Sequence, residues 1–382
     1  MKLTADWITR SETQAVCAAL TDAGFQALFV GGCVRNTLYD APVDDIDIST
    51  DATPDKVIEL AEGAGLRAVP TGIDHGTITV VSDHTPHEIT TFRRDVETFG
   101  RHAVVAFSTD VTDDARRRDF TMNALYADPA GHVIDPLNGL PDLQARRVRF
   151  IEDPDLRIRE DYLRILRFFR FHAWYGDADQ GLDAEGLAAV AANADGLDHL
   201  SRERVWTELR KLLTAPDPAP SVAAMRSAGV LAHVLPGSDD IALAPLVHLE
   251  RLADIRPDPI RRMAALGGQV DALRLSKAQA RQLDHLRDGM GSLALPAALG
   301  YRLGADTARD IVLLRAAQMG QVFDPADLIA AKTGADAQFP VKAADLMPAF
   351  QGAALGAKLT TLEGAWIASG FTLTKTELLA QI

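Results

Sequence analysis

The stretch that decides the fold reads GGCVRNTLYDAPVDDIDIST and spans residues 31–50. The apolar run before it predicts a buried strand over 27–30, and Gly31 and Gly32 predict a sharp turn at the end of that strand. A double glycine in this place is either a simple turn or a loop whose amides approach phosphate oxygens. Arg35 follows one helical turn later and would add a charged donor, which favours the phosphate interpretation.

Two aspartates end the same stretch. Asp45 and Asp47 alternate with isoleucines, which predicts a strand over 45–49. Residues i and i+2 of a strand share a face, so both carboxylates should project together while the isoleucines enter the core. Two carboxylates held that close repel each other, and a bound hard cation such as Mg²⁺ would neutralise this repulsion. Glu88 opens a similar alternating run and could supply a third carboxylate from a neighbouring strand; a solvated acidic face is the alternative.

Composition indicates an ordinary globular chain. The 382 residues include 47% hydrophobic and 24% charged residues, enough for a sizeable core and two or three domains. The two cysteines form no disulfide or zinc pattern, so we expect a reducing, cytoplasmic compartment. No run approaches the ~20 apolar residues of a membrane span. The net charge of −14 argues weakly against nucleic acid as a binding partner. Arginines nevertheless cluster at 116–118 and between 146 and 170, so a local basic surface is possible.

The chain changes character near its middle. Residues 1–145 mix strand patterns with helices, for example a helix over 53–65 that begins at a Thr-Pro pair. From about residue 154 onward helical periodicity dominates, interrupted by short Pro- and Gly-rich breaks. The prediction is therefore an α/β head followed by an all-α remainder.

Four further motifs occur after the strand–glycine–aspartate stretch, and the last of them ends at residue 211. They are RRRDFTMNAL (116–125), DPLNG (135–139), EDYLR (160–164) and RVWTELRK (204–211). In this order they resemble the class II nucleotidyltransferases, the family of tRNA CCA-adding enzymes and bacterial poly(A) polymerases, within the superfamily of DNA polymerase β. The resemblance implies a polymerase-β-like head with a mixed β-sheet over 1–145, a helical neck over 146–213, and a helical body and tail over 214–382 that bind tRNA.

The resemblance also implies roles for particular residues. It places the catalytic carboxylates at Asp45, Asp47 and Glu88, the first two as metal ligands. It places nucleotide and RNA contacts at Gly31, Gly32, Arg35, Arg118, Asp119, Asp161, Arg164, Arg167 and Arg170. Within the last motif, we expect Glu208 to brace the neck through an intrahelical ion pair with Lys211 or Arg204.

The EDYLR segment has a physical interpretation of its own. Its helical period predicts one helix on which Asp161, Arg164, Arg167 and Arg170 form a stripe, which a solvated charged face would also explain. An aspartate accepts from an amine and an arginine donates to a ring nitrogen or carbonyl. Cytosine and adenine each present an amine beside an acceptor, whereas uracil and guanine present a carbonyl beside an N–H. The family assigns Asp161 and Arg164 this selection of C and A.

The implied reaction is attack of an RNA 3′-hydroxyl on the α-phosphorus of CTP or ATP, with two Mg²⁺ on the aspartate pair and release of pyrophosphate. The partners would be CTP, ATP and the 3′ end and acceptor/TΨC arm of tRNA, and no membrane. Residues 93–110 resemble the flexible loop of complete CCA-adding enzymes, and the basic run typical of poly(A) polymerases is absent.

Other functions remain open from the sequence. They are a poly(A) polymerase, an enzyme that adds only CC or only A, a non-catalytic RNA-binding relative, and a small-molecule nucleotidyltransferase. A small-molecule nucleotidyltransferase would not explain the EDYLR motif or the long helical remainder.

Overall fold

The computed structural model describes residues 1–99, 102–271, 273–320 and 322–382. The chain divides into two compact units. Unit 1 comprises Met1–Leu212 and Pro220–Val234, and unit 2 comprises Leu213–Ala219 and Leu235–Ile382. The expected head lies in unit 1, as does the expected neck apart from Leu213, and every residue predicted for the functional site belongs to that unit.

A mixed sheet forms the centre of the head, as predicted. Its strands are β1 Leu28–Val30, β2 Asp47–Thr50, β3 Arg67–Gly72, β4 Thr77–Ser82, β5 Thr85–Thr91, β8 Tyr126–Ala127 and β9 Val133–Ile134. Their order is β3-β4-β5-β2-β1-β8-β9. Only β2 and β5 pair in parallel among these described strands, and the register places Asp47 opposite Glu88.

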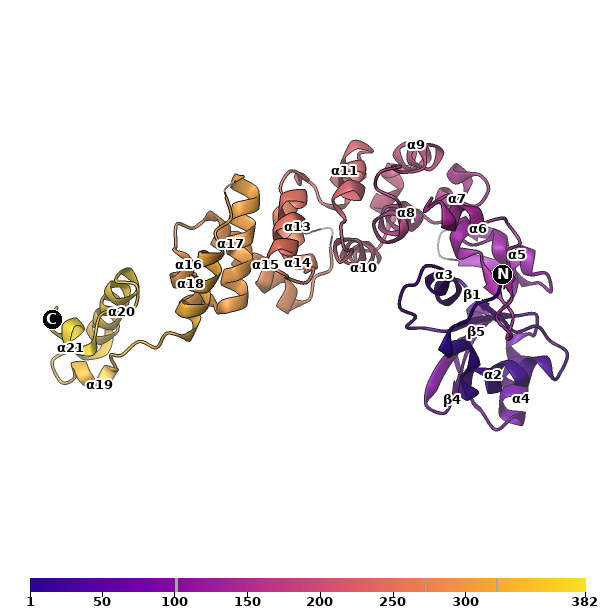
Figure 1. The fold of residues 1–382 in the computed structure, drawn as a ribbon, viewed down its shortest axis with the longest axis horizontal. Coiled ribbons are helices and arrows are strands. Elements are labelled where there is room, and N and C mark those ends of the chain that lie inside the picture. Colours follow the sequence, from indigo (N-terminus) through magenta and orange to yellow (C-terminus); the bar gives the residue numbers. More distant parts are fainter. Residues whose placement is uncertain (100–101, 272, 321) are drawn as a thin grey trace. The chain divides into compact units, whose positions relative to one another are not determined.

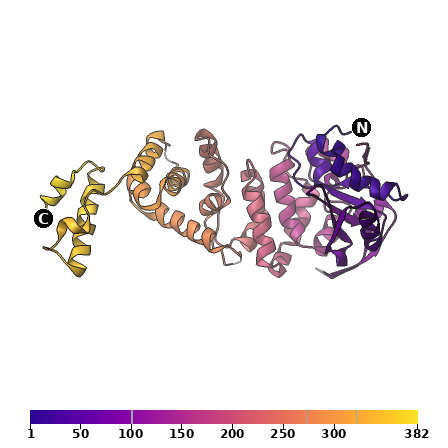
Figure 2. The same cartoon turned by 90° about the horizontal axis from the view of Figure 1, so that it is seen from below.

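Short helices surround this sheet. They are α1 Asp6–Thr9, α2 Ser11–Thr21, α3 Gly32–Leu38, α4 Pro54–Gly63, α5 Val111–Arg116 and α6 Leu140–Gln144, with 3₁₀ turns η1 Ile73–His75 and η2 Thr121–Asn123. Helices α2 and α4 pack on each other and on β4 (Figure 1 and Figure 2). Helix α4 begins where the sequence predicts, with Pro54 as its first residue. Proline suits this position because the N–H that it lacks would have no partner within the helix.

The DPLNG motif has a local structural reason. Asp135 accepts hydrogen bonds from the amides of Gly139 (2.7 Å) and Leu140 (2.9 Å) and so caps the start of α6. A Cβ atom at residue 139 would lie 2.2 Å from the carbonyl oxygen of Thr121, so only glycine fits this close approach.

Residues 93–110, which resemble the family's flexible loop, contain two strands. Strands β6 Arg93–Phe99 and β7 His102–Phe107 pair antiparallel in a separate two-stranded ribbon. The run contains several residues with high β-propensity, which favours strand pairing over an irregular loop.

The helical region begins at Pro154, as expected. Unit 1 continues with α7 Pro154–Glu160, α8 Leu163–Tyr175, α9 Ala184–Ala192, η3 Ala194–His199, α10 Arg202–Leu213, α11 Ala219–Ser227 and α12 Val230–Val234. Four phenylalanines pack the base of the neck against the head: Phe120 lies 4.9 Å from Phe150 and 5.1 Å from Phe171, and Phe150 stacks on Phe168 at 5.4 Å. Aromatic packing thus joins α8 to the segment after α5.

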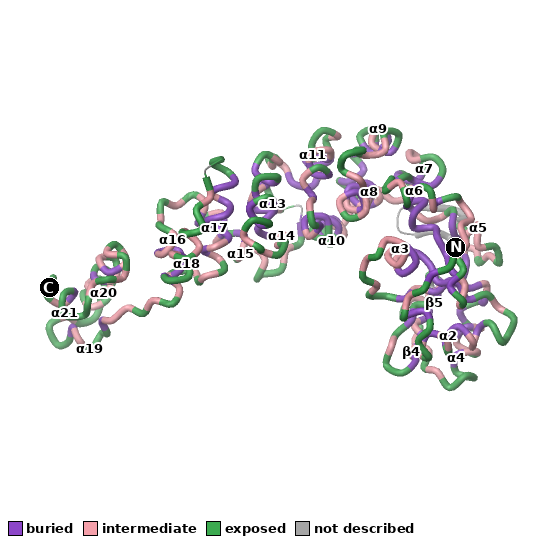
Figure 3. The backbone as a smooth tube through the Cα atoms, viewed as in Figure 1, coloured by how far each residue is buried: buried purple, intermediate pink, exposed green. Residues whose placement is uncertain are grey.

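Helices build the described part of unit 2. They are α13 Leu243–Leu252, α14 Pro259–Leu266, α15 Lys277–Gly291, α16 Pro296–Leu303, α17 Ala305–Met319, α18 Pro325–Asp336, α19 Ala343–Leu346, α20 Gly352–Ala368 and α21 Lys375–Leu379. Glu250 bridges two buried arginines, with 2.7 Å to Arg261 Nη2 and 2.7 Å to Arg262 Nη2. Figure 3 shows the buried residues in purple, intermediate residues in pink and exposed residues in green along the backbone of each unit.

Candidate active site

A cleft of about 400 Å³ in unit 1 collects most of the predicted residues. Its lining comprises Gly31, Gly32, Arg35, Asp47, Arg118, Asp119, Asn123, Asp161, Leu163, Arg164, Arg167, Phe171 and Arg204. These residues come from the glycine turn, strand β2, the RRRDFTMNAL segment, and helices α8 and α10 with the break before α8. Segments far apart in the sequence therefore meet at one site.

The carboxylates lie at one end of β2. Ile46 and Ile48 are buried, while Asp45 is exposed and Asp47 is half-buried, which agrees with the predicted alternation. The strand itself begins at Asp47 rather than at residue 45, so Asp45 lies just before it. Burial, together with the charges of Glu88 and Asp45, raises the pKa of Asp47 to about 6, and the charge of Arg118 opposes this rise. These carboxylates are therefore close enough to repel one another.

The glycine turn has the backbone that only glycine adopts readily. Gly31 has φ +67° and ψ −116° and precedes Gly32, the first residue of α3. Arg35 on this helix is buried, and its guanidinium donates to Asn123 Oδ1 (2.5 Å) and the Tyr175 hydroxyl (2.9 Å). The turn is thus tied to both the head and α8, with Arg35 at the wall of the cleft.

Asp119 joins the head to the neck. Its carboxylate accepts from Arg167 (2.5 Å to Nη2) and from the Asn123 side-chain amide (2.8 Å). Burial opposes ionisation, but the charge of Arg167 and these hydrogen bonds lower the pKa of Asp119 to about 2. Asn123 also accepts from Arg35, so a continuous chain of polar contacts crosses the cleft floor from α3 to α8. Sequence reasoning missed Asn123, although it lies within the motif that carries Asp119.

The EDYLR segment is not one helix, contrary to the prediction. Helix α7 ends at Glu160, and Asp161 is extended, with φ −153° and ψ 104°. The reason is local: the Asp161 side chain accepts from the amide of Leu163 (3.1 Å), a capping bond that competes with helical continuation. Asp161 and Arg164 nevertheless both line the cleft.

Both members of this pair already have partners. Arg204 Nη2 lies 2.6 Å from Asp161 Oδ2, and Arg164 pairs with Glu160 and donates to the carbonyl of Arg157 (2.7 Å). Their polar groups are therefore satisfied before any base arrives.

Arg170 lies outside the cleft. Its Nε is 2.5 Å from Glu208 Oε2, and both side chains are largely buried. The prediction that Glu208 pairs with Lys211 or Arg204 was therefore wrong: the brace connects α10 to α8, because the two helices pack against each other and Arg204 is engaged with Asp161.

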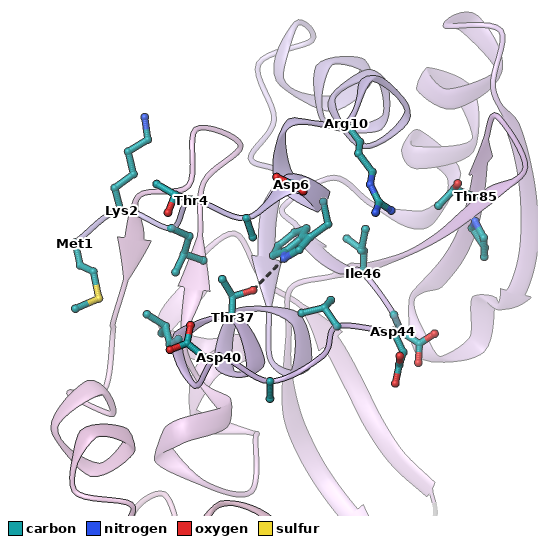
Figure 4. Close-up of a pocket in the computed structure, with 18 residues that line it drawn as sticks. Met1, Lys2, Thr4, Asp6, Arg10, Thr37, Asp40, Asp44, Ile46 and Thr85 are labelled. Carbon is teal, nitrogen blue, oxygen red and sulfur yellow. Dashed lines mark hydrogen bonds between the residues drawn. The ribbon is translucent and has the colours of Figure 1, made fainter.

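A second cavity of about 600 Å³ lies in unit 1 (Figure 4). The N-terminal segment and the loop before β2 line it, and Asp45 belongs to this lining rather than to that of the cleft. Trp7 in its wall donates to Thr37 Oγ1 at 2.9 Å. The sequence predicted that the two carboxylates project together, but in the structure Asp45 lines this cavity and Asp47 lines the cleft, because β2 begins only at Asp47.

The residues fit a magnesium site. The described residues contain no group of three or more His, Cys, Asp or Glu side chains placed to hold a metal by themselves. Magnesium is typically held by one or two carboxylates together with water and substrate phosphates, so such a group is not required. The pKa of Asp47 is raised chiefly by burial and further by the charges of Glu88 and Asp45, and a divalent cation would relieve the repulsion among these carboxylates.

Comparison with known proteins gives the class. Residues 27–149 match the family model of the poly A polymerase head domain, and residues 181–241 match that of a probable RNA- and SrmB-binding site of polymerase A. Two stretches of the chain therefore resemble the class II tRNA nucleotidyltransferases and poly(A) polymerases, and the mixed-sheet head with a helical remainder is the fold expected of that family. No helix of the described chain has both the length and the apolar character needed to span a bilayer.

Individual relatives refine this comparison. The chain is 40% identical over 238 residues to the mitochondrial CCA tRNA nucleotidyltransferase 1 of Mus musculus, covering 62% of this chain and 55% of the relative. It is 39% identical over 216 residues to the CCA-adding enzyme of Geobacillus thermodenitrificans, covering 56% and 52%. The chain thus spans about half the length of the curated relatives it matches.

Solved structures match over nearly the whole chain. The CCA-adding enzyme of Bacillus stearothermophilus in complex with CTP superposes with a TM-score of 0.74 at 27% identity, covering 94% of this chain and 92% of that one. The Thermotoga maritima CCA-adding enzyme complexed with tRNA_CCA gives 0.71 at 18% identity, covering 96% and 92%, a likeness of fold alone.

Proposed function

We propose that the chain is a nucleotidyltransferase that adds C, C and A to the 3′ end of tRNA from CTP and ATP without a nucleic-acid template. The observation that carries this proposal is the single cleft in which Asp47, the glycine turn and the Asp161–Arg164 pair meet. The likeness to a CTP-bound CCA-adding enzyme supports the choice of substrate.

In this reaction the glycine turn and the arginines bind the triphosphate. The backbone N–H groups at Gly31 and Gly32 and the guanidiniums of Arg35 and Arg118 present donors to phosphate oxygens, where charge grows in the transition state. Catalysis is then chiefly positioning of the 3′-hydroxyl in line with the α-phosphorus and the leaving pyrophosphate.

Asp45 and Asp47, with Glu88 beside them, would hold the metal. Bound Mg²⁺ would promote loss of the 3′-hydroxyl proton and neutralise phosphate charge. Asp47 must be ionised to act as a ligand. Because its pKa is raised to about 6, metal binding should weaken as the pH falls through about 6.

Asp161 and Arg164 would select the base. A cytosine or adenine amine would donate to the Asp161 carboxylate, and the acceptor beside it would receive a hydrogen bond from Arg164. Uracil or guanine would present mismatched donors and acceptors to these half-buried groups, and each polar group left without a partner costs about 1–3 kcal/mol. Arg204 and Glu160, the present partners, would keep the pair satisfied between reaction cycles.

The test uses tRNA that lacks its three 3′-terminal nucleotides, Mg²⁺, and each labelled nucleoside triphosphate alone and in combination. We expect two C additions from CTP and one A only after them. Long A tracts would instead identify a poly(A) polymerase, and addition that stops at CC or requires a CC end would identify a partial enzyme. No incorporation by a folded protein would contradict the proposal in favour of an RNA-binding role.

We also propose the cytosol as the compartment. Both cysteines are free and buried, which suits a reducing environment. The mitochondrial relatives make the matrix the alternative, and microscopy of the tagged full-length protein in its native cell distinguishes the two.

A further inference from the structure

The inference concerns Asp114, a buried carboxylate that lies behind the cleft and does not line it. This side chain on α5 is fully buried. Its Oδ1 accepts from Arg117 Nε (2.8 Å), and its Oδ2 accepts from the Tyr126 hydroxyl (2.8 Å) and from Arg118 Nη2 (3.1 Å). Burial opposes its ionisation, but Arg118 and Arg117 outweigh this and lower the pKa to about 2, so the carboxylate is charged at neutral pH.

Asp114 and Tyr126 hold only one side of Arg118. The Nε of that guanidinium donates to the Tyr126 hydroxyl (3.2 Å), and Nη2 faces Asp114. Its Nη1 has no hydrogen-bond partner among the residues that the structure describes. A Cβ atom added at Gly31 would lie 3.2 Å from this Nη1, so the unused donors of Arg118 lie at the glycine turn.

The same cluster is joined to the strand that carries Asp47. Ser49 is two residues further along β2 and therefore shares the face of Asp47. Its hydroxyl lies 3.4 Å from Asp114 Oδ2 and 3.5 Å from Arg118 Nη2. The position of Arg118 is thus set relative to both the glycine turn and the carboxylate strand.

We propose that Asp114, with Tyr126, is a positioning residue that holds Arg118 so that its Nη1 donors face the phosphate chain of the nucleotide. This deepens the proposed function and rests on it. An arginine that is fixed before binding does not lose side-chain freedom when phosphate binds. The free energy of its hydrogen bonds to phosphate is therefore not reduced by a cost of ordering the side chain. Asp114 contacts no substrate itself and acts through Arg118.

Inorganic triphosphate is the probe, because it has the phosphate chain of CTP without sugar or base. Its binding to the full chain is measured by calorimetry at fixed Mg²⁺ for wild type, Asp114→Asn and Tyr126→Phe. We expect about tenfold weaker binding for Asp114→Asn, the loss of about 1.4 kcal/mol typical of a charged hydrogen bond. Tyr126→Phe keeps the Asp114 charge, so we expect a loss of only about threefold.

A double-mutant cycle separates positioning from a general structural effect. If Asp114 acts only through Arg118, Asp114→Asn should cause no further loss of triphosphate affinity in an Arg118→Ala background. An equal loss in both backgrounds would overturn the proposal, as would triphosphate binding by Asp114→Asn within about twofold of wild type.

Asp142→Asn serves as the matched control. Asp142 is also a buried head carboxylate paired with an arginine, with 2.8 Å to Arg149 Nη2, but it lies outside the cleft. It should reduce thermal stability without changing triphosphate affinity. If Asp114→Asn does not fold, Tyr126→Phe alone decides: unchanged triphosphate affinity in this milder variant refutes the proposal.

The outcomes separate this inference from the proposed function. Triphosphate binding needs no incorporation, so a wild-type protein that adds no nucleotide but shows the coupling refutes the function and supports the positioning role. A wild-type protein that completes CCA but shows no coupling between Asp114 and Arg118 refutes the positioning role alone.

Discussion

Lowering the pH from 7 to 5 should weaken binding of a divalent cation to the nucleotide-free protein about tenfold. The prediction follows from Asp47, whose pKa is raised to about 6 by burial and by the neighbouring carboxylates. A group with this pKa is about nine-tenths ionised at pH 7 and about one-tenth ionised at pH 5, and only the ionised form is a good ligand. An aspartate at its model value of 3.8 would remain almost fully ionised over the same range.

The assay uses Mn²⁺ as a paramagnetic probe, with the free ion counted by electron paramagnetic resonance at pH 5, 6 and 7. Nucleotide is left out because phosphate groups titrate in the same range. Asp47→Asn should bind weakly at every pH and lose the steep dependence near pH 6. Arg118 lowers the pKa of Asp47, so Arg118→Ala should move the midpoint of this dependence to higher pH.

A wild-type affinity for Mn²⁺ that changes by less than about twofold between pH 7 and pH 5 would refute the reasoning, because it would mean that Asp47 is an ordinary carboxylate or not a ligand. Asp142→Asn controls for a general effect of acid on the head, since Asp142 is a buried carboxylate outside the cleft. It should retain the wild-type pH dependence.

Three further substitutions, two of them with a control variant, test other parts of the structure. Asp161→Ala should blur the preference for CTP and ATP over UTP and GTP while incorporation continues, as measured by competition between labelled triphosphates. Gly31→Ala introduces strain of about 1–3 kcal/mol at a positive φ and crowds the phosphate turn, so it should lower both melting temperature and CTP affinity. Gly24→Ala has similar strain in open space and should lower only the melting temperature. Glu250→Ala removes the carboxylate shared by two buried arginines, of which Arg261 keeps Asp310 and Arg262 keeps the carbonyl of Leu213, and should cost about 3–5 kcal/mol in urea unfolding of the whole chain. Glu59→Ala at an exposed ion pair should cost under about 1 kcal/mol.

Local patterns predicted the fold of the head well. The strand before Gly31, the alternation around Asp47 and the Thr-Pro start of α4 depend on nearest neighbours in the chain, and the structure confirms them. The break at Asp161 was missed because helical periodicity continues through it, while the capping bond to Leu163 decides the backbone there. Periodicity records which face is apolar, not which polar side chain competes with the helix.

The sequence indicated which residues line the cleft better than it indicated which side chains pair with one another. Motif order placed Arg118, Asp119 and Asp161 together, and the cleft contains all three. The pairing of Glu208 with Arg170 depends on how α8 and α10 cross, which no local pattern encodes. Asp114 was overlooked for the same reason: an aspartate beside an arginine run resembles a solvated turn until the fold buries it.

The central claim is tested most directly by mass spectrometry of tRNA that lacks its three 3′-terminal nucleotides, after incubation with CTP, ATP and Mg²⁺. The account predicts a mass gain of two cytidylates and one adenylate with the wild-type protein and no gain with Asp47→Asn of equal thermal stability. The same gain with Asp47→Asn, or no gain with the wild type, would contradict it.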